Sequence, residues 1–370
     1  MSLYGATGRK FRMKQERQLV EKILHALPSP TDRSFEAASL RAQGSGSKFR
    51  SRAPGAMHRL VSSTVRVGPG DDAAILSPSG ETDWVLSCDA FIENVHFHRE
   101  LHPPDSVGYK SLVRATSDLA AMGAAPRYFL LTLALPKPLI RSWLADFLKG
   151  MARASRELGI FVVGGDTTAS PTLAISITVL GEVPQGKAIL RSGAEAGDLI
   201  YVTGRLGRAQ LGLDLVLAGR ALNPELRAVV RPHLCPKIQI ELGAWLAKNR
   251  LATAMLDISD GLSTDLARLC SASGVGARIY TNRIPCITIS PSVSKKLRYR
   301  KFDPLQMALH GGEDYELLFT VSPSHARKLE RAPNFRTLTA IGEITKSKKI
   351  FLVNHAGKQW PLKPLGWDPF

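Results

Sequence analysis

The sequence predicts an α/β (α+β) protein built from two mixed α/β domains. The chain has 370 residues, which is longer than a domain with a single hydrophobic core usually is. From residue 65 onward, short apolar runs typical of buried strands alternate with segments of helical periodicity. Apolar residues make up 44% of the chain and charged residues 22%, which are the values of a globular protein.

The first 64 residues are predicted to form a basic extension outside both domains. Residues 15–27 carry apolar side chains at helical spacing, and Pro28 ends this predicted helix. Residues 28–64 are rich in Ser, Arg, Ala and Gly without periodicity, which predicts a flexible insertion. Residues 1–66 carry 13 Lys and Arg against 4 Asp and Glu, so about half of the net charge of +17 belongs to the extension.

The first domain is predicted over residues 65–187. Apolar or alternating runs predict its strands, which are residues 84–89, 128–135, 161–165 and 172–183. Helical spacing predicts its two helices, residues 107–123 and 140–158. Gly123 and Pro126 close the first helix, as these residue types commonly do.

The second domain is predicted over residues 188–370. The same patterns predict strands at residues 198–204, 252–259 and 314–321, and helices at residues 206–218, 237–249 and 262–273. Strands that alternate with helices in both halves favour mixed sheets with crossover connections.

Several classes of protein are disfavoured by composition and motifs. No run of 18 apolar residues occurs, so the sequence predicts no transmembrane helix. The four cysteines are widely spaced without a CxxC pair, which indicates neither a zinc site nor a disulfide framework and favours a reducing, cytoplasmic setting. The segment GSGSKFRS lacks the spacing of a phosphate-binding P-loop.

Carboxylates in apolar or glycine-rich surroundings are the most informative feature. A buried carboxylate without a partner is costly, whereas Mg²⁺ takes carboxylate oxygens together with substrate phosphates. Many of these carboxylates follow strands or glycines, and a metal site is therefore predicted among Asp71, Asp72, Asp89, Asp118, Asp166, Asp257, Asp260, Glu313 and Asp314.

Each carboxylate also has a structural interpretation that the sequence leaves open. Helix caps, turns and ion pairs within a helix all use acidic side chains. The residues concerned are Ser259 and Asp260 for a cap of the helix 262–273, Asp71, Asp72 and Asp166 for turns, and Asp118 with Arg114 for an ion pair. Five separate clusters in one chain nevertheless favour a common function.

Seven blocks between residues 65 and 370 carry a family resemblance. They are, in order, GPGDDAAIL, SCDAFIENVHF, SDLAAMGAAP, GGDTT, RSGAEAGD with IYVTG, DISDGLSTDL and GGEDYELLFTV. Together they resemble the thiamine-monophosphate kinase family, within the aminoimidazole-ribonucleotide-synthetase-like ATP-binding superfamily. The resemblance implies in-line transfer of the γ-phosphoryl group of ATP to thiamine monophosphate, assisted by several Mg²⁺ ions.

The resemblance also implies roles for individual residues. No general base is expected, because the acceptor phosphate is already an anion, and magnesium-assisted transfer would run through Asp118, Asp166 and Asp257. The implied metal ligands are Asp72, Ser87, Cys88, Asp89, Asp118, Asp166, Asp257 and Asp260. The implied ATP contacts are Gly165, Asp166, Arg191 and Ser259, and the implied acceptor contacts are His96, Glu313 and Trp367.

The residues implied to bind ATP or the acceptor have structural alternatives too. Arg191 could form a surface ion pair with Glu195. His96 could be a structural histidine, and Glu313 an exposed loop carboxylate. Trp367 could be a tail residue packed on the body of the protein.

The chain departs from the family pattern at four places. Cys88 stands where the family usually has threonine, and a thiol is a poor ligand for Mg²⁺, so only its backbone carbonyl would serve. The chain ends in GWDPF, where the family commonly has a tyrosine or phenylalanine and a histidine. Leu148 replaces a tyrosine found near the nucleotide in many members, and residues 28–64 are an insertion. None of these changes removes a carboxylate.

The resemblance further implies a homodimer in which the N-terminal domains form a strand barrel across the two subunits, while the C-terminal domain closes over ATP. One alternative is another ATP-dependent synthetase of the superfamily with a different acceptor. A selenophosphate-type enzyme expects a cysteine before the GDD block, whereas the first cysteine here is Cys88. Nucleic-acid binding is disfavoured, because the basic extension has few aromatic residues and no known signature.

Overall fold

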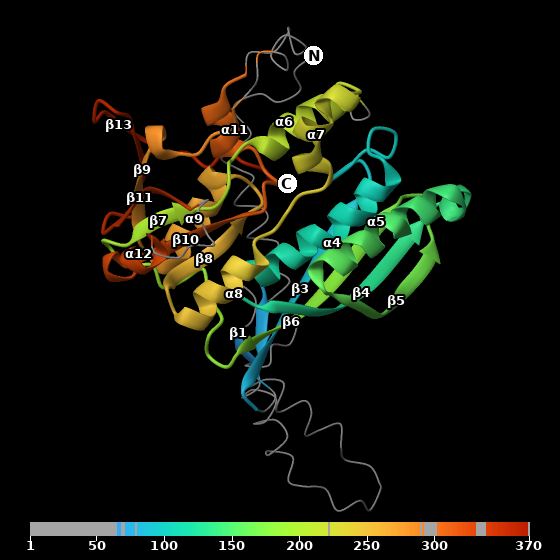
Figure 1. Ribbon diagram of the computed structural model, residues 1–370, viewed down its shortest axis with the longest axis horizontal. Coiled ribbons are helices and arrows are strands. Elements are labelled where there is room, and N and C mark those ends of the chain that lie inside the picture. The colour runs from blue at the N-terminus through green and yellow to red at the C-terminus, as the bar shows by residue number, and fades with distance from the viewer. Residues whose placement is uncertain are drawn as a thin grey trace, which may run out of the picture.

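The computed structural model contains two β-sheets with helices packed against them (Figure 1). The predicted helix 15–27 and the predicted insertion 28–64 lie outside the described part of the chain. The residues that the structure describes are 65–67, 71–77, 80–220, 223–288, 291, 302–330 and 338–368.

The first sheet has six strands in the order β1-β2-β3-β6-β4-β5. All neighbouring strands are antiparallel except β4 and β5, which are parallel. The strands are β1 Val65–Val67, β2 Ala74–Leu76, β3 Thr82–Ile92, β4 Ala125–Leu135, β5 Phe161–Ala169 and β6 Ala174–Pro184. The four predicted strands of this domain are thus confirmed, with β3, β4 and β5 longer than predicted.

Two long helices cover one face of this sheet, α4 (Pro104–Ala121) and α5 (Ser142–Leu158) (Figure 1). A short 3₁₀ turn, η1 (Lys137–Ile140), precedes α5. The helices approach closely because each offers a glycine to the other. A Cβ atom at Gly108 would lie 1.9 Å from the carbonyl oxygen of Phe147, and one at Gly150 would lie 1.7 Å from that of Asp105.

The second sheet has seven strands in the order β13-β12-β9-β11-β7-β10-β8. Only β9 and β12 pair in parallel. The strands are β7 Leu199–Val202, β8 Ala252–Ile258, β9 Gly276–Tyr280, β10 Glu316–Val321, β11 Thr339–Thr345, β12 Ile350–Val353 and β13 Gln359–Pro361.

The helical segments of this half include the three predicted ones, α6, α8 and α9, the last with the predicted bounds. The remaining helices and turns were not predicted. Within the described residues, the helices and turns with defined bounds are α6 Arg208–Leu217, η2 Pro224–Leu226, α7 Arg227–Leu234, α8 Ile240–Asn249, α9 Leu262–Ser273, η3 Thr281–Arg283, α11 Pro304–His310 and α12 Pro323–Glu330.

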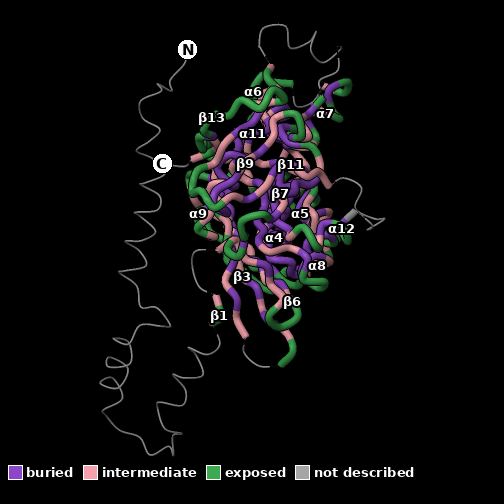
Figure 2. Tube along the Cα trace, turned by 90° about the vertical axis from the view of Figure 1, so that its left-hand side faces the viewer, coloured by how far each residue is buried: buried purple, intermediate pink, exposed green. Residues whose placement is uncertain are grey.

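Helix α4 joins the two halves of the molecule. The largest hydrophobic cluster unites Leu112 and Leu119 of α4 with Leu246 of α8 and Phe319 of β10. In Figure 2, buried residues, drawn in purple, fill the middle of the molecule. Side chains near the C-terminal end of α4 therefore lie where the two sheets meet.

The six-stranded sheet stays open in the described part of a single chain. Its edge strand β5 is exposed at all nine of its residues. Closure of a barrel with a partner subunit remains a prediction. None of the described helices combines the length and the apolar character needed to cross a membrane.

Candidate active site

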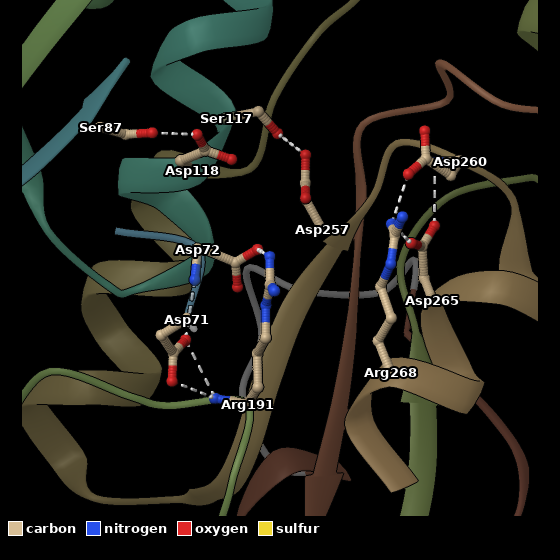
Figure 3. A network of polar contacts seen from close by, with 10 residues as sticks. All are labelled: Asp71, Asp72, Ser87, Ser117, Asp118, Arg191, Asp257, Asp260, Asp265 and Arg268. Carbon is tan, nitrogen blue, oxygen red and sulfur yellow. Dashed lines mark hydrogen bonds and ion pairs between the residues drawn. The ribbon is translucent and has the colours of Figure 1, made fainter. Parts of the chain in front are cut away.

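Three aspartates from separate elements meet at the junction of the two halves. Asp72 precedes β2, Asp118 lies in the last turn of α4, and Asp257 lies near the end of β8. One carboxylate oxygen from each lies within 4.8 Å of the others (Figure 3). Oxygen atoms at this spacing suit a hard divalent cation.

The electrostatics of this triad also fit a cation. Burial raises the pKa of Asp118 well above its usual value, and the charges of its acidic neighbours raise it further. Burial and the nearby Asp72 raise the pKa of Asp257 to about 7. Among the described residues, Asp72 Oδ2 is buried without a hydrogen-bond partner. Arg191 supplies one positive charge, through Asp72, so the three carboxylates together keep room for the charge of a divalent metal ion.

Two serines orient the triad (Figure 3). The Ser87 hydroxyl, from β3, donates to Asp118. The Ser117 hydroxyl, from α4, donates to Asp257 Oδ2 over 2.6 Å. Ser87 was among the predicted metal ligands, whereas Ser117 was missed, although it directly precedes Asp118 in the SDLAAMGAAP block.

Asp89 lies two residues after Ser87 on β3 and therefore points to the same face of the sheet. Arg114 Nε donates to Asp89 Oδ2 over 3.0 Å. The ion pair of Arg114 is thus with Asp89, and the structural alternative that paired it with Asp118 is wrong. Arg114 was missed as a site residue, and it links Asp89 to the helix that carries Asp118.

The side chain of Cys88 lies on the opposite face of β3 from Ser87 and Asp89. Its sulfur lies 3.5 Å from Ser176 Oγ and accepts a hydrogen bond from Thr178 Oγ1 over 3.3 Å. Successive residues of a strand point to opposite faces, which explains this position. The Cys88 thiol is therefore directed away from the triad.

Arg191 approaches the triad from the segment before β7. Its guanidinium pairs with Asp72, and its backbone N–H lies 3.2 Å from both carboxylate oxygens of Asp71. The alternative ion pair with Glu195 is therefore wrong. Asp71 tethers the Arg191 backbone, whereas Asp72 faces the other two aspartates (Figure 3).

Asp260 lies beside the triad rather than in it (Figure 3). It pairs with Arg268, and its backbone N–H donates to Asp265 over 3.0 Å. Helix α9 begins after Gly261, and neither Asp260 nor Ser259 caps it with a side-chain hydrogen bond. The capping alternative is therefore wrong, because the carboxylate of Asp260 is turned toward Arg268.

Gly165 and Asp166 lie on the exposed edge strand β5, outside the triad. Asp166 Oδ1 accepts the backbone N–H of Thr167 over 2.9 Å. Gly165 has φ +149°, and a Cβ atom there would lie 1.8 Å from the carbonyl oxygen of Leu131. Only glycine fits this contact between β5 and β4.

Glu313 and Trp367 are both attached to the turn that follows β8. The Glu313 N–H donates to the carbonyl oxygen of Ser259 over 2.7 Å. The Trp367 N–H donates to that of Asp260 over 3.0 Å, while its side chain stays 47% exposed. The Ser259–Asp260 backbone therefore holds two of the three predicted acceptor contacts.

His96, the third predicted acceptor contact, lies on the N-terminal side. Its Nδ1 accepts the backbone N–H of Ile92 over 3.0 Å, and its ring packs 5.7 Å from that of Phe91. Burial, aided by Arg114, lowers the pKa of His96 to about 4, although Glu313 acts in the opposite direction. His96 is therefore neutral near pH 7 and lies within the electrostatic range of Glu313.

Arg114 connects the acceptor residues to the carboxylates. Although burial opposes it, the pKa of Arg114 lies above its usual value because Tyr315, Asp89, Glu313 and Asp118 surround the guanidinium. The predicted acceptor contacts and the triad thus belong to one continuous polar region.

The chain is similar to known proteins over most of its length. Residues 70–183 match the family model of the AIR synthase related protein, N-terminal domain, and residues 195–354 match that of the C-terminal domain. The chain is 35% identical to the thiamine-monophosphate kinase of Synechococcus elongatus over 76% of this chain and 85% of the relative. The chain belongs to the thiamine-monophosphate kinase family of AIR synthase related proteins.

Other members of the thiamine-monophosphate kinase family match over similar lengths. The Bacillus subtilis relative is 33% identical over 78% of this chain and 89% of its own length. A solved structure described as AaThiL complexed with AMPPCP and TMP has a TM-score of 0.73 and 32% identity, covering 87% of this chain and 100% of its own. The hydrogenase maturation protein HypE, at 21% identity and a TM-score of 0.62, covers 81% of this chain and 94% of its own and shares the fold.

Proposed function

We propose that this chain transfers the γ-phosphoryl group of ATP to thiamine monophosphate and so forms thiamine diphosphate. The observation that carries the proposal is the convergence of Asp72, Asp118 and Asp257 between the two sheets of a thiamine-monophosphate kinase fold. Carboxylates without a P-loop suit a reaction in which two polyanions must be brought together.

Mg²⁺ is the cation that we propose for the triad. When bound, Mg²⁺ neutralises phosphate charge and orients the reacting groups. Asp72, Asp118 and Asp257 would hold it, while Ser87 and Ser117 keep two of these carboxylates in fixed orientations. The raised pKa of Asp257 supports this assignment, because a carboxyl that retains a proton without metal gains from a cation beside it.

The remaining predicted ligands extend the proposal to the nucleotide. We assign further metal contacts to Asp89 and Asp260, and to Cys88 through its backbone carbonyl only. Asp260 would have to exchange its pairing with Arg268 for the metal. The nucleotide contacts proposed are Gly165, Asp166, Arg191 and Ser259, and Arg191 already lies against Asp72.

The acceptor would bind between His96, Glu313 and Trp367. The exposed Trp367 ring offers a stacking surface for thiamine, and Glu313 offers a carboxylate to its aminopyrimidine. No residue needs to remove a proton, because the acceptor phosphate is already anionic.

We also propose a homodimer and a domain boundary. The exposed edge strand β5 supports a partner that pairs with this edge, which would close the sheet into a barrel. The change of sheet between β6 and β7 supports a boundary near residue 188, with domains at residues 65–187 and 188–370.

A direct assay tests the activity. Purified protein is mixed with Mg²⁺, ATP and thiamine monophosphate, and thiamine diphosphate is measured by thiochrome fluorescence. We expect product from the monophosphate and none from free thiamine. Asp118→Asn should lower kcat by more than about a hundredfold, since removing one charged ligand weakens charge stabilisation in the transition state.

Asp146→Asn is the matched control. Asp146 is an exposed aspartate of α5, and within the part of the chain that the structure describes its ion pair is with the neighbouring Lys149. This substitution should leave kcat unchanged. Full activity of Asp118→Asn would contradict the triad. ATP consumption without thiamine diphosphate would instead favour a synthetase with a different acceptor.

A further inference from the structure

A chain of buried basic side chains ends at Glu313. Lys110 of α4 is 2% exposed, His233 of α7 is fully buried, and His102, just before α4, is 4% exposed. The Glu313 carboxylate, at 24%, is the member that reaches solvent. Sequence reasoning missed these three basic residues, because Lys110 and His233 are 123 positions apart in the chain.

Consecutive polar contacts connect the four side chains. Lys110 Nζ lies 2.8 Å from Glu313 Oε2, and His233 Nδ1 lies 3.2 Å from the same oxygen. Behind them, His102 Nε2 lies 3.1 Å from His233 Nε2. Glu313 is thus contacted by one ammonium group and one imidazole, and a second imidazole supports the first.

One choice of histidine tautomers lets His102 donate to His233 and lets His233 donate to Glu313. His102 Nδ1 lies 3.2 Å from the backbone nitrogen of His98 and 3.0 Å from its carbonyl oxygen, so it can accept from the first or donate to the second. In the tautomer in which Nδ1 accepts, His102 donates through Nε2 to His233 Nε2, and the His233 Nδ1 proton is left for Glu313. Burial lowers the pKa of His102 to about 4, so the imidazole is neutral near pH 7 and one of its nitrogens must accept.

The backbone also constrains the positions of Glu313 and His233. Glu313 has φ +67°, an unusual value for a residue with a side chain, and its N–H is anchored on Ser259. Gly212 of α6 makes room for His233, because a Cβ atom at Gly212 would lie 2.6 Å from the Cβ of His233. Strained backbone held in this manner is commonly found at ligand sites.

Stability alone does not explain the arrangement. Burial of Lys110 opposes its charged form, and a buried ion pair often stabilises a fold no better than apolar residues of the same shape. Burial would also raise the pKa of Glu313, yet Lys110 and His233 outweigh it and hold the pKa well below the usual range. The basic residues therefore keep a charged carboxylate at the edge of the acceptor region.

We propose that Lys110, His233 and His102 are positioning residues that hold Glu313 as an oriented anion against the aminopyrimidine ring of the acceptor. An ionised carboxylate only accepts hydrogen bonds, so it selects a ring that presents an amino donor. This inference rests on the proposed function, and it assigns the ring specificity of that function to a buried set of residues that do not touch the substrate.

A double-mutant cycle on binding tests the inference. Thiamine monophosphate is titrated by calorimetry into protein saturated with Mg²⁺ and AMPPCP, so no turnover is required. Lys110→Met and Glu313→Gln should each weaken binding about ten- to a hundredfold, the range for a charged hydrogen bond. The double variant should bind no more weakly than Glu313→Gln alone, because Lys110 acts through Glu313.

Three controls separate positioning from folding. AMPPCP affinity should change less than twofold in every variant. Tyr109→Phe removes a neighbouring hydrogen bond of α4, to Glu157, and should leave acceptor binding unchanged. His233→Asn, which keeps a donor near Glu313, should bind at least fivefold more tightly than His233→Leu. If Lys110→Met does not fold, His233→Leu replaces it in the cycle.

The analogue in which an oxo group replaces the ring amino group gives a second readout. Wild type should prefer the amino compound, and Lys110→Met should lose most of this preference. Independent effects of Lys110→Met and Glu313→Gln, or an equal loss of affinity for AMPPCP, would overturn the positioning role and leave the proposed function untouched. Failure of the wild type to bind thiamine monophosphate would overturn the proposed function and this inference with it.

Discussion

The protonation of the Asp314 carboxyl group is expected to depend on pH in the neutral range. It follows Glu313 and accepts the backbone N–H groups of Gly207 and Ala209, over 2.6 and 2.9 Å, at the start of α6. A helix N-terminus favours a negative charge, whereas burial disfavours it. Burial is the larger effect here, and it raises the pKa of Asp314 from its ordinary 3.8 to about 7.

The raised pKa of Asp314 has a definite consequence for stability. The folded state binds the Asp314 proton more tightly than the unfolded chain does. The resulting contribution to the free energy of unfolding is therefore complete below pH 4 and is lost as the pH rises through about 7. We expect the free energy of unfolding of wild type, relative to Asp314→Asn, to fall between pH 5 and pH 8. The slope can reach at most about 1.4 kcal/mol per pH unit.

Urea unfolding at pH 5, 6.5 and 8 measures this difference. Asp146→Asn, at an exposed aspartate, serves as the control and should run parallel to wild type at every pH. A parallel course for Asp314→Asn would show that Asp314 does not take up a proton in this range.

At the scale of elements, the contact between α4 and α8 connects the aspartate triad to the second half of the molecule. Gly243 of α8 lies so close to α4 that a Cβ atom there would be 2.2 Å from the carbonyl oxygen of Ala120. Ala120 lies two residues after Asp118, so a displacement of α8 reaches the triad directly.

We expect Gly243→Ala to lower the free energy of unfolding by about 1–3 kcal/mol, the usual cost of overpacking. Helix propensity alone predicts the opposite sign, a gain of roughly 0.5–1 kcal/mol. Urea unfolding measures the sign, with the exposed Lys248→Ala on the same helix as the control. A more stable Gly243→Ala protein would mean that α8 can move away from α4 at little cost.

The elements also show what the sequence could predict. Strong apolar periodicity predicted α9, and continuous apolar runs predicted β4 and β10. Strand β13 was missed because its three residues are exposed and carry no apolar alternation. Helix α7 was missed because it contains Pro232, which normally breaks a helix.

The candidate site likewise contains residues that the sequence could predict and residues that it could not. Asp72, Asp118 and Asp257 could be predicted because each lies in a short block whose glycines and apolar neighbours make a carboxylate conspicuous. Lys110 could not, because a single lysine in a helix usually extends to solvent, and only tertiary packing places it against Glu313.

At the scale of the whole molecule, one edge of the first sheet is conspicuously exposed. Phe161, Val162 and Val163 of β5 are 65%, 59% and 57% exposed. An unpaired edge strand with apolar side chains favours association with another chain. Gly165 and Asp166, which we assign to the nucleotide, lie on the same strand, so association and ATP binding are expected to be connected.

The dimer can therefore be tested together with activity. We expect light scattering at micromolar concentration to give twice the chain mass of 40.2 kDa. Val162→Asp should shift the protein to a single chain, because burying an unpaired charge in an interface costs several kcal/mol, and it should raise the KM for ATP. Leu217→Asp, at a residue of α6 that is 46% exposed, should change neither property. A wild-type mass of one chain would contradict the dimer, whereas a monomeric Val162→Asp with an unchanged KM would separate association from nucleotide binding.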